Sequence, residues 1–115
     1  RKETKKMSKK IEFNYNGKEY TLEYNREAIM VMEKAGFSLD AYVQKPMLMA
    51  TMAFEGAFYM HHRKTQANVI QEIYENIGDK EGLNKQLISM INEAYEYLFD
   101  SENKNDEKNI QWKAV

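Results

Sequence analysis

The sequence predicts an α+β fold in which an N-terminal β-hairpin packs on a mostly α-helical bundle of about four helices. Residues 11–22 alternate between apolar and polar side chains on both sides of an Asn-Gly pair, which is typical of a hairpin. Residues 26–99 instead repeat their apolar side chains at helical spacing. A chain of 115 residues suits a single domain with one modest core.

The stretch IEFNYNGKEYTLEY, residues 11–24, predicts both the hairpin and its register. Asn16 and Gly17 tolerate the positive φ angles that a two-residue type I′ turn requires. Folding the chain about this turn gives the following pairs: Tyr15 with Lys18, Phe13 with Tyr20, Ile11 with Leu22, Glu12 with Thr21 and Lys10 with Glu23. One face is then apolar and the other polar, so the apolar face must rest on the helices.

Two short helical segments are expected next. Asn25 can cap a helix over residues 26–35, which Gly36 ends in the left-handed conformation. Four of its residues are expected to share the buried face: Ala28, Val31, Met32 and Ala35. Ser38 can cap a further turn over residues 39–44.

The stretch PMLMATMAFEGAFYMHH, residues 46–62, predicts a helix that is apolar on nearly every side. Proline suits the first turn of a helix, and only Thr51, Glu55 and His62 gather in a narrow polar sector. Two interpretations stay open. The helix is the buried spine of the bundle, or part of it forms a groove for a partner's apolar helix, to which flexible methionines are suited. Three alanines add a flat side for close helix packing: Ala50, Ala53 and Ala57.

Two amphipathic helices are expected to complete the bundle. Thr65 can cap a helix that ends at Ile77, before Gly78. Its apolar stripe consists of Val69, Ile70, Ile73, Tyr74 and Ile77. A last helix is expected from Glu81 to Phe99. Its stripe consists of Leu83, Leu87, Met90, Ile91, Ala94 and Leu98.

Both ends of the chain are expected to lie outside the globular domain, which spans residues 9–99. Met7 resembles a natural start, so residues 1–8 are expected to be an expression remnant or a flexible N-terminus. Residues 100–115 are expected to form a polar C-terminal extension. Trp112 near its end either docks on the protein's own body or anchors an interface, since tryptophan is a frequent interface residue.

The composition argues against several classes of protein. A net charge of −1 gives no overall attraction to nucleic acid or to an anionic membrane. The chain has no cysteine, which excludes disulfides and thiolate metal sites and fits a reducing cytoplasm. No segment reaches the roughly 20 apolar residues that a membrane-spanning helix needs, and the N-terminus lacks the apolar core of a signal peptide.

Catalytic and metal sites are not expected. His61 and His62 would point about 100° apart on a helix and cannot chelate one ion together, so a solvated helix end is the expected role. Glu33 and Glu55 have no nucleophile beside them, and Glu33 is expected to be exposed and paired locally. The five glycines form no phosphate-binding motif. We therefore expect no enzyme, no cofactor and no metal.

The motifs and the order of the elements carry a resemblance. The hairpin pattern F-x-Y-N-G-K-E-Y-T-L leads into a helix with A-x-x-x-M-E-K-A-G, followed by a hydrophobic helix and two amphipathic helices. The residues that carry it are Phe13 to Leu22, Ala28, Met32, Glu33, Ala35, Gly36 and Phe37. The later EIYENIGDKEGLNKQLISMINEAYEYLF and NIQWKAV fit the same layout. The chain resembles the small tail assembly chaperones of long-tailed, siphovirus-like bacteriophages and prophages.

The resemblance implies a non-enzymatic role in the cytoplasm of the infected bacterial host. Such chaperones bind the long, helical, hydrophobic tape measure protein, keep it soluble, help to recruit the tail tube protein and are absent from the mature virion. Repeated weak contacts along one partner would gain from a homo-oligomer, for which the hairpin edges offer a route. The residues that we expect to contact the partner are Met49, Met52, Met60 and Trp112.

Two alternatives to the chaperone stay open. The first is a small phage or prophage regulatory protein that binds a host protein or nucleic acid, based on the basic stretches RKETKKMSKK and HHRK. Acidic residues elsewhere cancel these charges, and no aromatic stacking pattern accompanies them, so we expect no nucleic-acid binding and no membrane binding. The second is a minor structural component of the virion, which would remain in purified particles.

Overall fold

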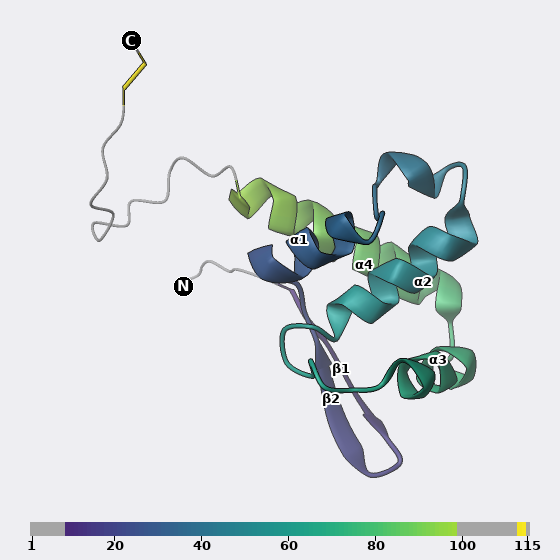
Figure 1. The fold of residues 1–115 in the computed structure, drawn as a ribbon. Helices are drawn as coiled ribbons and strands as arrows, with labels where there is room; N and C mark the ends of the chain where they lie inside the picture. Colours follow the sequence, from purple (N-terminus) through teal and green to yellow (C-terminus); the bar gives the residue numbers. More distant parts are fainter. Residues whose placement is uncertain (1–8, 99–112, 115) are drawn as a thin grey trace, which may run out of the picture.

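A computed structural model describes residues 9–98 and 113–114. The elements follow the predicted order (Figure 1): β1 (Ile11–Tyr15), β2 (Lys18–Leu22), α1 (Arg26–Lys34), the short 3₁₀ helix η2 (Asp40–Tyr42), α2 (Pro46–Ala57), α3 (Ala67–Asn76) and α4 (Lys80–Leu98). The predicted α+β fold, a hairpin followed by four helices, is confirmed. The predictions for residues 1–8 and 100–112, for Trp112 and for the side chain of Leu98 lie outside the described residues.

The hairpin has the predicted register and turn. The paired residues are Ile11 with Leu22, Glu12 with Thr21, Phe13 with Tyr20, Asn14 with Glu19 and Tyr15 with Lys18. Asn16 and Gly17 adopt φ angles of 53° and 82°, as a type I′ turn requires. The expected pairing of Lys10 with Glu23 is wrong, because the ladder ends at Leu22 and Glu23 turns to His61 instead.

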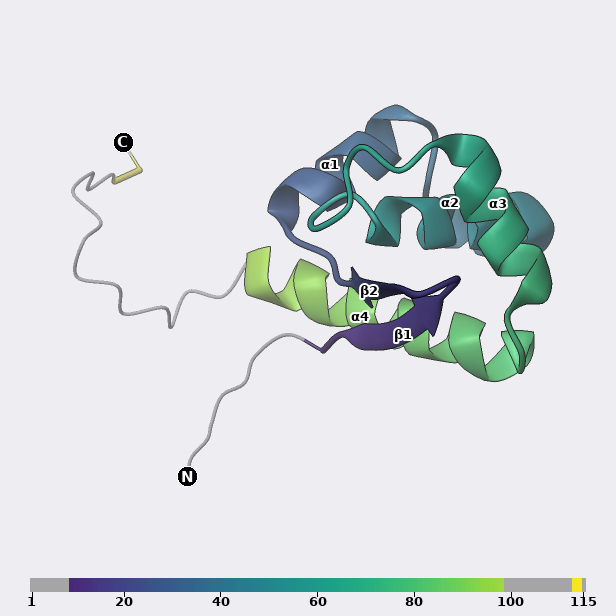
Figure 2. The same ribbon diagram turned by 90° about the horizontal axis from the view of Figure 1, so that it is seen from below.

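The hairpin is held against two helices (Figures 1 and 2). The Tyr20 ring packs edge-on against Phe58, with the ring centres 5.7 Å apart. At the start of β1, the Lys9 backbone N–H donates to Glu93 on α4 over 2.9 Å. These contacts support a two-stranded sheet that would be marginal alone, while Ile11, Phe13 and Tyr15 of its apolar face stay partly exposed.

Capping residues define the start of the helical part as predicted. Asn25 Oδ1 accepts a hydrogen bond from the Ala28 backbone N–H over 2.8 Å. Gly36 follows α1 with a φ of 112°, which a residue with a side chain rarely adopts. Pro46 occupies the first turn of α2, also as predicted. Ser38 Oγ accepts from the Asp40 N–H over 3.1 Å, but Leu39 is the residue that caps η2, so the prediction of Ser38 as the cap is wrong by one position.

α2 is the central helix of the bundle, and it contacts α1, η2, α3 and α4. Its buried residues are Met49, Ala50, Ala53, Phe54 and Ala57. The alanines give the flat side that was predicted, and Phe54 and Phe58 pack edge-to-face with their ring centres 5.2 Å apart. The interpretation of α2 as the spine is confirmed for this face.

The prediction that this helix runs to His62 is wrong, because α2 ends at Ala57. The Ala57 carbonyl, which the helix end leaves without an intrahelical donor, accepts from the Glu23 backbone N–H over 3.1 Å. The chain then turns, and the His62 N–H donates to the Phe58 carbonyl over 2.7 Å. His62 therefore does not share a polar sector with Thr51 and Glu55.

α1 is rotated relative to the prediction. Its buried residues are Ala28, Ile29 and Met32, whereas Val31 and Ala35 are exposed. Met32 packs over Gly56 so closely that a Cβ at position 56 would lie 2.3 Å from its sulfur. This contact turns the Ala28–Met32 side of α1 toward α2 and leaves Val31 at the surface.

The predicted stripes of α3 and α4 face the core, although Val69, Tyr74, Ile77 and Ala94 are only partly buried. The buried residues are Ile70 and Ile73 on α3, and Leu83, Leu87, Met90 and Ile91 on α4. The prediction of Thr65 as a cap is wrong, because α3 begins at Ala67 and the Thr65 N–H donates to the His62 carbonyl. At the start of α4, Asp79 acts as the cap, since its Oδ1 accepts from the Gly82 N–H over 3.1 Å. The φ angle of Asp79 is 52°.

A side-chain hydrogen bond joins α1 to α4. The Tyr95 hydroxyl donates to Glu33 Oε2 over 2.6 Å. Burial, followed by the hydrogen bond to the Glu33 carboxylate, raises the pKa of Tyr95 to about 12. Glu33 is exposed as expected, but its partner lies on another helix, so the expectation of local pairing is wrong.

The close contact between α1 and α2 makes a testable prediction. Replacing Gly56 by alanine should lower the free energy of unfolding by about 1–3 kcal/mol, because the added methyl group must displace the buried Met32 side chain. Urea unfolding measures this cost. Gly78→Ala is the matched control, since a Cβ there would meet nothing within 4 Å.

The same substitution in a Met32→Ala background separates overpacking from other effects of losing a glycine. With the Met32 side chain removed, the cost of Gly56→Ala should largely vanish, since alanine favours a helix over glycine. An equal cost in both backgrounds would show that the contact with Met32 is not the reason for the glycine.

Candidate partner-binding surface

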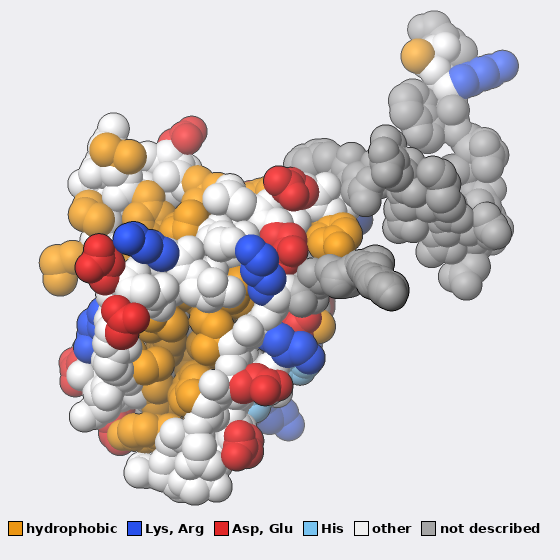
Figure 3. Space-filling model, turned by 180° about the vertical axis from the view of Figure 1, so that it is seen from behind, with side chains coloured by type: hydrophobic (Ala, Val, Ile, Leu, Met, Phe, Trp, Pro, Cys, Tyr) orange, Lys and Arg blue, Asp and Glu red, His pale blue; other side chains and the backbone are white. Residues whose placement is uncertain are grey.

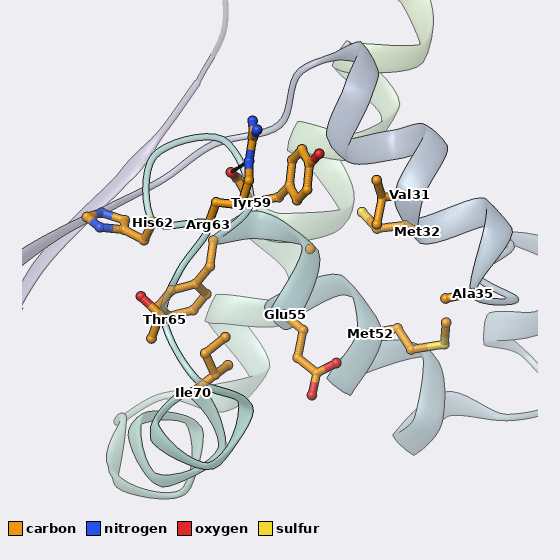
Figure 4. A pocket seen from close by; sticks show the side chains of 12 residues that line it. Val31, Met32, Ala35, Met52, Glu55, Tyr59, His62, Arg63, Thr65 and Ile70 are labelled. Atoms are coloured by element: carbon orange, nitrogen blue, oxygen red, sulfur yellow. Dashed lines mark hydrogen bonds between the residues drawn. The ribbon is translucent and has the colours of Figure 1, made fainter.

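An apolar groove lies between α1 and the outer side of α2 and is closed at one end by the turn over residues 58–65 (Figure 4). We call it the α1–α2 groove. Val31, Met32 and Ala35 form its α1 wall, and Met52 and Gly56 form much of its α2 wall. Its volume is about 170 Å³. The rotation of α1 described above is what brings Val31 and Ala35 to this groove.

The side chains of the α1–α2 groove are mostly apolar. In Figure 4 the Met52 side chain extends from α2 toward Ala35, which caps the C-terminal end of α1. At the closed end, the Arg63 guanidinium stacks over the Tyr59 ring, 4.2 Å from its centre. Glu55 is the acidic residue among the described residues that line the groove. The groove therefore suits an apolar side chain far better than a charged one.

A second groove lies between α2 and α3. We call it the α2–α3 groove, and its volume is about 340 Å³. Its lining residues are Met47, Thr51, Phe54, Glu55, Ile70, Gln71, Tyr74 and Glu75. Glu55 and Ile70 line both grooves, so the two are neighbours along one exposed side of α2.

Large apolar side chains are exposed where α2 begins. Val43 is 86% exposed and Met47 is 84% exposed, and Leu48 is also exposed. Of these residues, Met47 lines the α2–α3 groove. A single exposed apolar residue is ordinary, but several near each other in the chain beside an apolar groove are typical of an interaction site. The first turn of α2 thus adds exposed apolar surface beside the α2–α3 groove, whereas Thr51 and Glu55 are exposed polar residues farther along the same side.

Apolar side chains are also exposed on the face of the molecule that lies behind the view of Figure 1. Figure 3 shows apolar side chains gathered in a hollowed strip in the half of the molecule that holds the hairpin and α3, with charged side chains around it. Hairpin residues that pack on the core while staying partly exposed are Ile11, Phe13 and Tyr15. The Tyr15 hydroxyl donates to the Glu72 carboxylate of α3, which links the two elements there.

The structure separates the residues that were expected to contact a partner. Met52 is half-buried and lines the α1–α2 groove. Met49 is only 2% exposed and belongs to the core, so its side chain faces away from any partner. Met60 is half-buried beyond the end of α2 and lines neither groove. Trp112 lies outside the described residues.

Several residues of this surface were missed by the sequence interpretation. Helical spacing assigned Val31 and Ala35 to the core, and no pattern distinguished Val43 and Met47 from buried residues. One signal was available. In a helix that is apolar on all sides, Met47 lies in the first turn, where fewer neighbouring elements can cover it.

Two histidines tie the turn after α2 to the hairpin. His61 Nε2 lies 2.8 Å from Glu23 Oε1, and the Glu23 side chain is largely buried. His62 Nε2 accepts a hydrogen bond from the Thr21 backbone N–H over 2.9 Å, and its ring packs against Tyr20. The expectation of a solvated helix end is therefore wrong for His62, which fastens the turn that closes the α1–α2 groove.

The hydrogen bond of His62 requires a neutral imidazole, because the nitrogen that accepts from Thr21 cannot carry a proton. The environment favours this state. Burial, followed by the positive charges of Lys18 and His61, lowers the pKa of His62 below its ordinary value. At neutral pH the turn is thus held by an uncharged histidine.

Neither a metal site nor a membrane span is found in the part of the chain that the structure describes. No three side chains of His, Cys, Asp or Glu lie together as metal ligands would. No described helix combines the length and the apolar character needed to cross a bilayer.

One comparison with known proteins gives a match. A family model described as a domain of unknown function, DUF5055, matches residues 7–115. The match includes the hairpin, all four helices and both grooves. The searches of curated proteins and of solved structures find no match.

The histidine of the turn leads to a prediction about pH. The folded state lowers the pKa of His62 below the value of about 6.5 that it has in the unfolded chain. Neutral His62 therefore contributes its full stabilisation above about pH 6.5. This contribution is lost as the pH falls through the pKa of His62 in the folded state. The free energy of unfolding should therefore decrease as the pH falls from about 7.5 to 5. Urea unfolding at several pH values measures this dependence.

The variant His62→Gln provides the control, because a glutamine oxygen can accept from Thr21 without titrating. The variant should lose less stability than the wild type over the same pH range, because it lacks the contribution of His62. Parallel losses in the two proteins would contradict a role for His62.

Proposed function

Since the chain belongs to the DUF5055 family of domains of unknown function, we propose its function from its own surface. The protein binds an apolar α-helix of another protein along the outer side of α2. The observation that carries this proposal is the α1–α2 groove, with Val31 and Met52 on its walls and exposed Met47 at the start of the same helix.

The size of the groove suits a side chain from a partner helix. A cavity of about 150 Å³ can admit a benzene molecule. The α1–α2 groove, at about 170 Å³, thus has room for one large apolar side chain. The neighbouring α2–α3 groove could receive a second one, since partner helices place their anchors three, four or seven residues apart.

The flexible side chains around the grooves favour a tolerant binder. Met52 and Met47 are unbranched and can adapt to apolar side chains of different shapes. A partner that offers many similar apolar segments needs such tolerance. The tape measure protein of a long-tailed phage is a partner of this kind, as the resemblance to tail assembly chaperones implies.

We therefore assign the protein to tail assembly, as a proposal. It would bind the tape measure protein in the cytoplasm of the infected host, keep it soluble and help to recruit the tail tube protein. Burial of one large apolar side chain contributes about 1.5–3 kcal/mol, so a single groove binds weakly. Several copies along one tape measure protein, or a homo-oligomer, would hold it more firmly.

Two adjacent residues of α1 offer a matched test of the groove. Val31 and Met30 are 41% and 45% exposed, but only Val31 lines the α1–α2 groove. Val31→Glu should weaken binding of the tape measure protein about tenfold or more, because a carboxylate would be desolvated against an apolar helix. Met30→Glu should leave binding within about twofold.

Co-expression with the tape measure protein of the same genome provides the measurement. The wild type and Met30→Glu should keep the tape measure protein in the soluble fraction, and Val31→Glu should do so poorly although it folds. A tape measure protein that is equally insoluble with and without this chain would contradict the proposal. Retention of the protein in purified phage particles would favour a structural component of the virion.

A further inference from the structure

A basic hollow adjoins the closed end of the α1–α2 groove, on the side of the hairpin. Its cationic side chains are Lys18 of β2 and Arg63 and Lys64 of the turn, and its volume is about 550 Å³. His61 and His62 also line it. It lies outside the apolar surface on which the proposed function rests, and nothing in that function uses its charge.

The positive charge of the basic hollow is only partly balanced. None of the described residues that line it is acidic. Glu23 lies against His61, and Glu27 lies 3.7 Å from Arg63 in an exposed pair that contributes little. Lys18 and Lys64 form no ion pair with another described residue, so the hollow retains positive charge.

The basic hollow and the apolar groove adjoin each other across the turn over residues 58–65. His62, Arg63 and Thr65 line both of them. Figure 4 shows His62 on the side of the turn that faces the strands, whereas Val31 and Met52 lie on the other side. A chain that leaves the groove past this turn therefore enters the basic hollow.

The apolar character of the α1–α2 groove restricts where a partner can carry acidic residues. Glu55 and Arg63 both line this groove, so their charges offset each other, and a carboxylate bound there would be desolvated against mostly apolar side chains. Beyond the turn, the same carboxylate would meet Lys18 and Lys64. The two neighbouring sites thus select different parts of one segment.

We propose that the basic hollow binds carboxylates of the same partner, so that the preferred segment is an apolar helix followed by a cluster of acidic residues. This inference rests on the proposed binding of an apolar helix and adds the chemistry that selects among such helices. An acidic peptide suits the hollow better than nucleic acid, because the cations form a short patch without a row of exposed aromatic rings for bases.

Two synthetic helical peptides of about 20 residues test the inference. Both carry leucine and methionine at helical spacing, and one ends in three glutamates where the other ends in three glutamines. Fluorescence anisotropy at about 50 mM and 300 mM salt measures both dissociation constants. We expect the acidic peptide to bind the wild type about tenfold more tightly at low salt, with a smaller difference at high salt.

Charge-reversal variants locate the effect. Lys18→Glu with Lys64→Glu should abolish the preference for the acidic peptide and leave binding of the neutral peptide within about twofold. Lys34→Glu with Lys85→Glu makes the same change in net charge at exposed sites outside the hollow and should keep the preference. If the first variant fails to fold, Lys18→Gln with Lys64→Gln replaces it, and the wild-type comparison of the two peptides still decides.

The outcomes separate the two proposals. Equal binding of both peptides to the wild type would overturn the acidic preference and leave the apolar groove intact. Binding of neither peptide would overturn both proposals. An anionic oligonucleotide that binds the hollow more tightly than the acidic peptide would overturn the inference in favour of nucleic acid.

Discussion

All the other helices pack around α2, and the way its C-terminal end is held decides where binding surface remains. Its small and aromatic side chains bury one face, and the hairpin segment attaches at its end. The Ala57 carbonyl accepts from the Glu23 N–H, and the Ala53 carbonyl accepts from the buried Tyr24 hydroxyl over 2.6 Å. Because the chain turns back toward the hairpin here, the outer side of α2 stays uncovered between α1 and α3.

The turn after α2 joins the structural and the binding parts of the molecule. His62 fastens this turn to β2, and its neighbour Arg63 lies at the boundary between the apolar groove and the basic hollow. The same short segment thus closes one site and opens the other. A partner with an apolar helix and a following acidic cluster would be complementary to both, and the flexible methionines would tolerate variation in the apolar part.

Local chemistry made much of the fold predictable, and packing between distant elements made the rest unpredictable. The Asn16-Gly17 turn sets the register of the hairpin, and Asn25 sets the start of α1, within a few residues of sequence. The end of α2 depends on Glu23, and the inward face of α1 depends on Gly56, far away in the chain. For the candidate site, the apolar character of α2 was predictable, but only packing distinguishes buried Met49 from groove-lining Met52.

The eight methionines of the chain allow the most direct test of helix binding along α2. Methyl NMR of the protein labelled at methionine can follow each of them during titration with a helical segment of the tape measure protein. The account predicts large shifts for Met47 and Met52, which border the two grooves, and small ones for Met90, which is buried on α4. Unchanged Met47 and Met52 signals in a saturated complex would contradict it.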